Sequence, residues 1–344
     1  MTFTVTATAP VRVCDLGGWT DTWFAERGVV ISIAVRPGAT ARVVRHRRGE
    51  RPQRVELAAP DLPGGPDALL WAVIDHVGVP DDADLEVVVS CGVPPGASMG
   101  TSAAVTVALL TALRRSARST APPATLTRRP ADQMAEPPGT VAAEAHAVAA
   151  EAHAVEVGRV GREGGVQDQV AAAYGGVNRI EIDPYPATRV TPIRVPDGLG
   201  PRMRTVYAGG PHRSAEVHAQ VIEAVAAAGP SSPALARLRR CAEAGFDALL
   251  AGDLAGFGRA MSDNTDAQAD LAPGVVGADA IAVIALARAH HALGWKVNGA
   301  GGAGGTVTVL LPRPEAAPAF DAAAVDAGYT PLAVDLSPLG VTRS

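Results

Sequence analysis

The chain has 344 residues, of which 47% are apolar and 19% are charged, and its net charge is −5. This length exceeds what one hydrophobic core usually serves, so we expect two domains that share a cleft. The negative charge argues against a nucleic-acid partner, because neutralising phosphates requires a basic surface.

The first sixty residues alternate between apolar and polar positions as strands do. The pattern predicts strands bounded by Gly or Pro at 2–9, 29–36, 41–48 and 53–59. This beginning lacks the charged-then-apolar order of a signal peptide, and no apolar run reaches membrane length, so we expect a cytoplasmic protein without a membrane partner. Three widely spaced cysteines, Cys14, Cys91 and Cys241, fit a reduced compartment better than a disulfide framework.

The segment PPGASMGTSAAVTVALL at 94–110 predicts a loop of small residues that opens a helix. A helix at 67–78 and a buried strand at 85–93 precede it. The free N–H groups and dipole of a helix N-terminus form a natural anion site, and a nucleotide phosphate is the obvious anion. The chain has one lysine, Lys296, so this loop lacks the lysine of the GxxxxGK[ST] phosphate loop and must use backbone, hydroxyls and metal.

After this helix, residues 114–140 are rich in Arg, Ser, Thr and Pro and predict a long exposed stretch. The heptapeptide VAAEAHA then occurs twice, at 141–147 and 148–154, and predicts a lengthened helix to which we attach no function. The segment 161–182 reads as a loop, a short helix and a strand.

The rest of the chain predicts a layer flanked by helices. It comprises a strand at 202–209, helices at 215–229, 234–252 and 279–294, and a glycine-rich hairpin that ends the pattern. The proline-bearing segment near residues 190–200 marks the domain boundary.

Four stretches occur together in an informative order. They are APVRVCDLGGWTD (9–21), PPGASMGTSAA (94–104), GGVQDQ (164–169) with Glu156 before it, and KVNGAGGAGG (296–305). This combination resembles the GHMP kinases, the superfamily of galactokinase, homoserine kinase and mevalonate kinase. The resemblance implies an α/β fold of two domains, a ribosomal protein S5 domain 2-like N-terminal domain (1–195) and a ferredoxin-like C-terminal domain (196–344).

Within the superfamily the chain is similar to the branch of D-glycero-D-manno-heptose 7-phosphate kinase and L-fucose kinase. The QDQ-AAA-GG-N pattern is nearer the heptose enzyme, whereas Trp19 and the GTS of the loop are nearer the fucose enzyme. Three positions depart from the family loop, Met99 in place of leucine, Ser98 in place of glycine and Thr101 in place of the first serine.

Asp168, in a turn flanked by glycines, is the expected general base, because a carboxylate beside the acceptor hydroxyl can take its proton. Arg12 matches the basic residue of the first family motif and would keep that base ionised. The resemblance assigns magnesium to Ser102 and Glu156, hard oxygen ligands of the kind the ion prefers. Glu144 and Glu151 compete for this role, but only Glu156 has the family's offset of twelve residues before Asp168.

The resemblance also assigns two larger sets of residues. The ATP site comprises Pro95, Gly96, Ala97, Ser98, Met99, Gly100, Thr101, Ser102 and Ala103. The sugar site comprises Gly17, Gly18, Trp19, Thr20, Asp21, Gly175, Gly176 and Arg213. Trp19 either covers an apolar sugar face or is buried in the core, and Arg213 would bind a sugar phosphate. Lys296 has a mainly structural role.

The expected function is transfer of the ATP γ-phosphate, with Mg²⁺, to the anomeric hydroxyl of a heptose 7-phosphate or related sugar. The alternatives are an L-fucose kinase, a kinase of amino-acid or isoprenoid alcohols, and a non-catalytic sensor of sugar or nucleotide. The expected partner is the small-molecule sugar, and a homodimer is left open.

Overall fold

The computed structural model describes residues 2–50, 54–59, 68–117, 139–209 and 214–344. The strands are β1 (Phe3–Leu16), β2 (Gly28–Arg47), β3 (Val55–Ala58), β4 (Ala83–Cys91), β5 (Val177–Ile182), β6 (Thr188–Ile193), β7 (Met203–Tyr207), β8 (Gly294–Val297), β9 (Thr306–Leu310), β10 (Thr330–Leu332), β11 (Asp335–Leu336) and β12 (Thr342–Arg343). The α-helices are α1 (Ala68–Val77), α2 (Thr101–Ala117), α3 (Gly139–Ala154), α4 (Gln167–Tyr174), α5 (Leu199–Arg202), α6 (Ser214–Val225), α7 (Pro233–Ala251), α8 (Leu254–Ala269), α9 (Ala278–Ala289) and α10 (Ala317–Asp326).

The first sheet has eight strands, and its main path runs β12-β1-β2-β4-β3, with β11 and β5 also paired to β2 and β6 paired to β5. The strands predicted at 29–36 and 41–48 are one continuous strand, β2. The pairing with β1 passes from Ala9↔Ala39 to Val11↔Val35, so β2 has two more residues than β1 in this interval. Pro37 lies among them, and an irregularity of this kind lets a proline interrupt the ladder without ending the strand.

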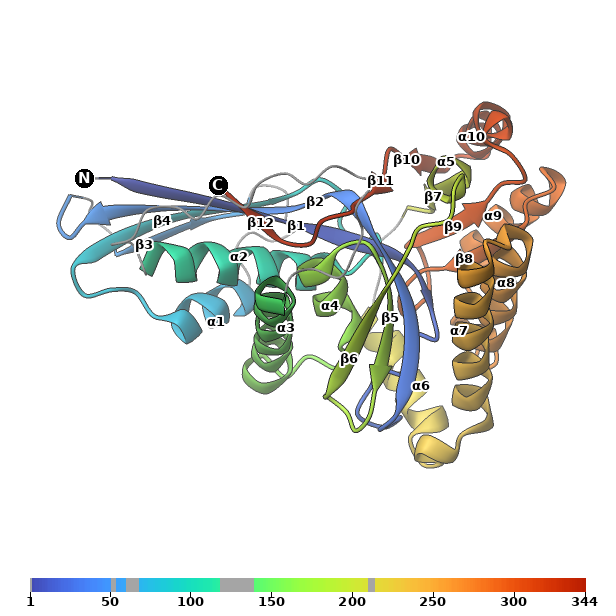
Figure 1. The fold of residues 1–344 in the computed structure, drawn as a ribbon, viewed down its shortest axis with the longest axis horizontal. Helices are drawn as coiled ribbons and strands as arrows, with labels where there is room; N and C mark the ends of the chain where they lie inside the picture. The colour runs from blue at the N-terminus through green and yellow to red at the C-terminus, as the bar shows by residue number, and fades with distance from the viewer. Residues whose placement is uncertain (1, 51–53, 60–67, 118–138, 210–213) are drawn as a thin grey trace.

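Helices α1, α2, α3 and α4 cover one face of this sheet (Figure 1). Helix α2 lies at its centre and contacts β1 and β2 most extensively. Its apolar residues, among them Val105, Leu109 and Leu113, are buried in the core as their spacing predicts. The loop of small residues at 94–100, called the phosphate loop below, therefore ends at a helix that the core holds in place.

The second sheet has four strands in the order β10-β7-β9-β8. Helices α9 and α10 pack together beside it (Figure 1), and Val283, Phe320 and Val309 contribute to their shared core. Helices α8 and α10 are absent from the sequence-based expectations. The family fold predicted from the sequence is confirmed by the two mixed layers and by the solved structures described below.

The chain passes from the first sheet to the second between β6 and β7, close to the predicted boundary at 195 and 196. The last residues then return to the first sheet. Strand β11 pairs with β2, and β12 pairs with β1 through Ala7↔Arg343 and Thr8↔Thr342. The C-terminal segment thus belongs in space with the N-terminal strands.

Of the predicted exposed stretch 114–140, residues 118–138 lie outside the described residues, whereas Arg114–Ala117 form the last turn of α2. The duplicated heptapeptide forms α3, as predicted, and a π-helical turn (Val155–Arg159) continues it. No disulfide joins the three cysteines. Across the described ranges, no helix combines the length and the hydropathy that a membrane span requires.

Candidate active site

A cavity of about 1130 Å³ lies where the four sequence motifs meet. Its walls come from the end of β1 and the turn after it, the phosphate loop, the loop and first turn of α4, helix α6 and the glycine-rich turn after β8. These segments extend in sequence from Arg12 to Ala300, so only the folded chain brings them together. The cavity is large enough for a nucleotide and a small acceptor, since pockets for single ligands have volumes of about 300 to 1,000 Å³.

The phosphate loop and the start of α2 line this cavity from Gly96 to Ser102. Helix α2 begins at Thr101, so its free N–H groups face the cavity, as an anion site requires. Met99 is fully buried in the core, where it replaces the family's leucine without loss of packing. Pro95 and Ala103 do not line the cavity. The structure thus brings seven of the nine predicted ATP-site residues to its wall.

Ser98 has a left-handed backbone conformation, with φ = 57°. Its carbonyl accepts a hydrogen bond from Arg12 Nη1 at 2.5 Å, whereas its buried Oγ has no hydrogen-bond partner among the described residues. A left-handed conformation costs an L-residue about 1–2 kcal/mol relative to glycine. Ser98, in place of the family's glycine, therefore introduces local backbone strain into the phosphate loop.

Ser98→Gly is accordingly expected to raise the free energy of unfolding by about 1 kcal/mol, because relief of the strain exceeds the added entropy of the unfolded chain. Denaturant unfolding measures the change. Ser98→Ala is the matched control, since it removes the unpaired hydroxyl but keeps the Cβ and its strain. Equal stabilities of the two variants would contradict the strain at this position.

Arg12 and Asp168, which are 156 residues apart, form a two-pronged ion pair. Arg12 Nε donates to Asp168 Oδ1 at 2.7 Å, and Nη2 donates to Oδ2 at 3.2 Å. Gly100 lies directly against this carboxylate, because a Cβ on Gly100 would be 3.1 Å from Asp168 Cγ. The predicted base and its electrostatic partner are therefore in contact, and the phosphate loop packs on both.

The Arg12 guanidinium is buried, with 4% of the residue exposed. Burial acts to lower its pKa, but the nearby carboxylates of Asp168, Asp15 and Asp21 outweigh burial and raise the pKa of Arg12. Arg12 therefore stays cationic, and it carries a fixed positive charge into the centre of the cavity.

Ser102 and Glu156 also meet in the cavity wall, with 3.3 Å between Ser102 Oγ and Glu156 Oε2. Gln169 Nε2 donates to the other carboxylate oxygen at 3.1 Å. A hydroxyl and a carboxylate beside a phosphate loop are hard oxygen donors, so this pair fits magnesium. Within the described part of the chain, no three His, Cys, Asp or Glu side chains gather as metal ligands, which leaves phosphate and water to complete such a site.

The two competing glutamates on α3 have other partners. Glu151 accepts from His76 at 2.7 Å and pairs with Arg114 at 2.5 Å. Glu144 lies 3.8 Å from Arg343. Neither lines the cavity, whereas Glu156 reaches it from the π-helical turn.

Burial raises the pKa of Glu156 from its ordinary value of 4.5 to about 7, and the nearby Asp168 adds to this effect. A carboxyl group whose pKa is raised by folding destabilises the folded state as it ionises, so the penalty grows between about pH 4.5 and pH 7 and reaches about 3 kcal/mol above that window. Glu156→Gln is expected to remove it.

The stability gained by Glu156→Gln without magnesium should therefore be small near pH 4.5 and largest at pH 8. Magnesium affinity of the unmodified protein should rise with pH through about 7, because only the ionised carboxylate binds the ion. Denaturant unfolding and magnesium titration, each across this pH range, measure the two effects. An equal stability gain at pH 5 and pH 8 would contradict the burial penalty.

The predicted sugar site is built on the turn after β1. Asp21 is buried and accepts from the Gln167 N–H at 3.1 Å. Burial raises its pKa to about 6, with Asp168 and Asp15 contributing. Trp19 is buried in a core cluster with Phe24 and also lines the cavity, and its contact with a sugar face stays a prediction.

The other residues of this turn shape it from behind. Thr20 is fully buried, and its Oγ1 donates to Gly17 O at 2.7 Å. Gly17 N donates to Asn264 Oδ1 at 2.7 Å, which fixes the turn to α8. A Cβ on Gly17 would be only 2.1 Å from Val29 O, so this position requires glycine.

Gly175 and Gly176 do not line the cavity, and their predicted contact with substrate finds no support. Gly175 ends α4, and a Cβ on it would lie 2.1 Å from the backbone of Leu339. Gly176 N donates to Ser337 O at 2.7 Å. Gly175 therefore makes room for the returning C-terminal segment, and Gly176 binds that segment through its backbone. Arg213 lies outside the described residues.

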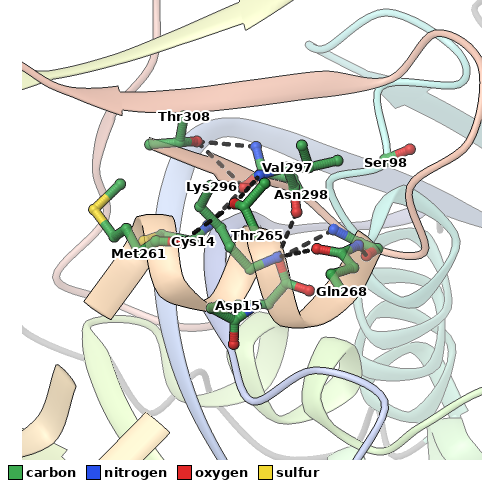
Figure 2. Close-up of polar contacts among 12 residues, drawn as sticks. Cys14, Asp15, Ser98, Met261, Thr265, Gln268, Lys296, Val297, Asn298 and Thr308 are labelled. Carbon is green, nitrogen blue, oxygen red and sulfur yellow. Dashed lines mark hydrogen bonds and ion pairs between the residues drawn. The ribbon is translucent and has the colours of Figure 1, made fainter. Parts of the chain in front are cut away.

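Lys296 is buried beneath the glycine-rich turn, with 1% exposed (Figure 2). Its Nζ donates to Gln268 Oε1 at 3.0 Å, to the carbonyl of Val297, and to Asp15 Oδ1 at 3.5 Å. Burial lowers the pKa of Lys296, and Asp15 acts against this shift. The structural role predicted for the lone lysine agrees with these contacts.

Several cavity residues carry no signal that our reading of the sequence used. Asp15 and Gln167 flank the sugar turn, and His218 and Ile222 reach the cavity from α6. The rings of Trp19 and His218 lie 4.8 Å apart, so α6 closes the cavity on the side of the turn after β1. Gln167 stands within the quoted GGVQDQ motif, where Asp168 drew attention away from it.

Comparison with known proteins finds a family-model match and solved structures of similar fold. Residues 68–137 match the family model described as the GHMP kinases N terminal domain. No curated protein matches the chain in sequence. A solved D-glycero-D-manno-heptose 1-phosphate kinase from Bacteriodes thetaiotaomicron is 18% identical with a TM-score of 0.71, over 99% of this chain and 98% of that chain.

Two further solved structures are similar over nearly their whole length. The galactokinase of Lactococcus lactis complexed with galactose is 17% identical with a TM-score of 0.69, over 98% of this chain and 95% of that one. The mevalonate kinase of L. major in complex with R-mevalonate is 18% identical with a TM-score of 0.67, over 97% of this chain and 96% of that one. These likenesses show that the chain has the fold of these kinases, and the family-model match shows that its segment 68–137 resembles the N-terminal domain of the GHMP kinases.

Proposed function

We propose that the protein is an ATP-dependent sugar kinase that transfers the γ-phosphate to an anomeric hydroxyl. The observation that carries the proposal is the Arg12–Asp168 ion pair, which lies between the phosphate loop on one side and the turn bearing Asp21 on the other. A base in this position lies between the site for the ATP phosphates and the site for the acceptor hydroxyl, as phosphoryl transfer requires.

Asp168 accepts the proton of the acceptor hydroxyl as the oxygen attacks phosphorus. Its side chain is 25% exposed and is held by two hydrogen bonds from Arg12, so it is both fixed and accessible. The charge of Arg12 offsets negative charge that develops on the transferring group. Asp21 accepts hydrogen bonds from sugar hydroxyls and orients the acceptor.

The N-terminus of α2 and the loop before it hold the phosphates through backbone N–H groups. Ser102 and Glu156 would hold magnesium, which when bound neutralises phosphate charge. Because Gln169, one residue after the base, donates to Glu156, the π-helical turn that carries Glu156 is tied to the short helix that carries the base.

The acceptor we propose first is a heptose 7-phosphate or a related sugar, on the resemblance of the QDQ-AAA-GG-N pattern. A specific observation favours a second candidate, a neutral sugar of the L-fucose kind. Six of the described residues that line the cavity are acidic, namely Asp15, Asp21, Glu156, Glu163, Asp168 and Glu223, whereas two, Arg12 and Arg162, are arginines. A negatively charged wall suits a neutral polyol better than a sugar phosphate.

A panel of acceptors separates these possibilities. Purified protein, ATP and Mg²⁺ are incubated with heptose 7-phosphate, L-fucose, galactose, homoserine and mevalonate, and the products are identified by mass spectrometry. A sugar 1-phosphate is the expected product. If only homoserine or mevalonate is phosphorylated, the acceptor is not a sugar. If sugar or ATP binds but no acceptor is phosphorylated, the protein is a sensor.

A further inference from the structure

We propose that Asp15 and Gln167 form a hydroxyl-binding subsite for the acceptor, with Lys296 holding Asp15 in place. This inference rests on the proposed sugar kinase function and adds two residues to it. It begins with buried polar atoms that have no partner.

Buried polar atoms in folded proteins nearly always have a hydrogen-bond partner, so those without one point to a missing ligand or water. Among the described residues, five cavity-lining side chains each bury such an atom. The atoms are Asp15 Oδ2, Trp19 Nε1, Ser98 Oγ, Gln167 Oε1 and Gln169 Oε1. The cavity wall therefore contains several buried polar atoms without a partner, and most of them are hydrogen-bond acceptors.

Asp15 carries the strongest of these acceptors. The residue is 1% exposed, and its Oδ1 accepts from Gly299 N at 3.0 Å and from Lys296 Nζ at 3.5 Å. These contacts fix the carboxylate from one side only (Figure 2), and its Oδ2 remains without a partner. A buried carboxylate oxygen in this state attracts a hydrogen-bond donor and repels an anion.

Gln167 lies next to it across Gly18. The point that a Cβ on Gly18 would occupy is 2.7 Å from Asp15 Oδ2 and 3.2 Å from Gln167 Nε2. Gly18 therefore packs directly against a carboxylate oxygen and an amide nitrogen, which lie close to each other beside the turn. A hydroxyl group in contact with both can donate to Asp15 and accept from Gln167, a combination that a carboxylate or a fully ionised phosphate group cannot make.

The same subsite is tied to the reacting groups. Gln167 directly precedes Asp168, and its backbone N–H donates to Asp21 Oδ2 at 3.1 Å. Asp15 is three residues after Arg12, and its Oδ1 holds the turn at Gly299 that closes on the phosphate loop. A sugar hydroxyl bound here therefore has a fixed position relative to both Asp21 and Asp168. The ligand class is a neutral polyol segment, and any phosphate on the acceptor must lie elsewhere.

The test pairs protein variants with sugar analogues. Sugar binding is measured by calorimetry without ATP, and KM for sugar and for ATP is measured wherever turnover occurs. Gln167→Met and Asp15→Asn are expected to weaken binding of the preferred sugar roughly 10- to 100-fold and to leave KM for ATP within about twofold. Gly18→Ala should have a similar effect, because its methyl group would lie 2.7 Å from Asp15 Oδ2 and displace this oxygen.

Deoxy analogues of that sugar then identify the hydroxyl. The analogue that lacks it should bind the unmodified protein weakly and should lose little further affinity in Asp15→Asn, since the contact is already absent. Asp84→Asn is the matched control, because Asp84 is a buried aspartate that accepts from Gly49 N at 2.7 Å away from the cavity. It should leave sugar binding unchanged.

Asp15→Asn leaves Lys296 buried without its counter-charge and can fail to fold, which is why Gln167→Met, outside the ion pair, stands beside it. Unchanged sugar affinity in Gln167→Met and Gly18→Ala would overturn the subsite. So would strictly additive losses for every deoxy analogue, or the absence of sugar binding to the unmodified protein. Sugar binding without phosphorylation, lost in these variants, would support the subsite and reject only the kinase function.

Discussion

Replacing Asp168 with Asn is expected to lower kcat by about 10²- to 10⁴-fold, the usual contribution of a general base. The substitution keeps the size of the side chain and an oxygen that can accept from Arg12 Nε, so the phosphate loop packed against it should stay in place. Only the ability to take a proton is removed. We therefore expect the loss in kcat, with ATP binding preserved.

Steady-state kinetics with the preferred acceptor and calorimetric titration with ATP measure the two quantities. Asp253→Asn serves as a control, because Asp253 caps helix α8 by accepting from Gly256 N at 2.8 Å and does not line the cavity. A kcat within tenfold of the unmodified enzyme would show that another group, or none, takes the proton. Simultaneous loss of ATP binding would instead give Asp168 a structural role.

The motifs were predictable because each is local. The phosphate loop is recognised by small residues that precede an apolar helical pattern. Glu156 is recognised by its fixed offset from Asp168. Arg12 and Asp168 were predicted as partners from the family resemblance, and the structure shows their contact. Short segments of this kind carry their signal in a few neighbouring residues.

Helix α8 was missed for a physical reason. Its sequence, LAGFGRAMSDNTDAQA, contains glycines and short polar residues that favour turns over helices. Packing forms this helix against its propensity, since α8 contacts both α7 and β8. Gly258 permits the close approach, because a Cβ there would lie 2.4 Å from Leu293 O. Tertiary contact between distant segments leaves no local pattern to read.

Asp15 and Gly175 illustrate the same limit in the site. Asp15 has a role only beside Lys296, which is 281 residues away, so its own surroundings in sequence look like an ordinary strand end. Gly175 was assigned to substrate because it ends a family pattern, but the C-terminal segment occupies that space. Strands β11 and β12, which are two residues each, could not be predicted as partners of β2 and β1.

Arg12→Met is expected to lower kcat by about 10²- to 10³-fold, as removal of a fixed donor from a transition-state site does. The guanidinium is nearly fully buried and joins three parts of the site, donating twice to Asp168 and once to the carbonyl of Ser98. Methionine fills much of the same volume but leaves these oxygens without donors. The folded state should therefore also lose stability, by about 3–5 kcal/mol, as when one partner of a buried pair is removed.

Arg12→Lys separates charge from geometry. Lysine retains the positive charge but cannot form the two-pronged contact with Asp168 and reach Ser98 O at the same time. Its kcat should thus fall between those of the unmodified enzyme and Arg12→Met. Arg45→Met is the control, because Arg45 also pairs with an aspartate, its Nη2 donating to both carboxylate oxygens of Asp82 at 2.8 and 2.9 Å, away from the cavity. Steady-state kinetics and denaturant unfolding of the three variants measure these effects. If Arg12→Met and Arg45→Met have equal kcat, Arg12 does not act on the reaction. If Arg12→Lys has the kcat of the unmodified enzyme, the positive charge alone is sufficient.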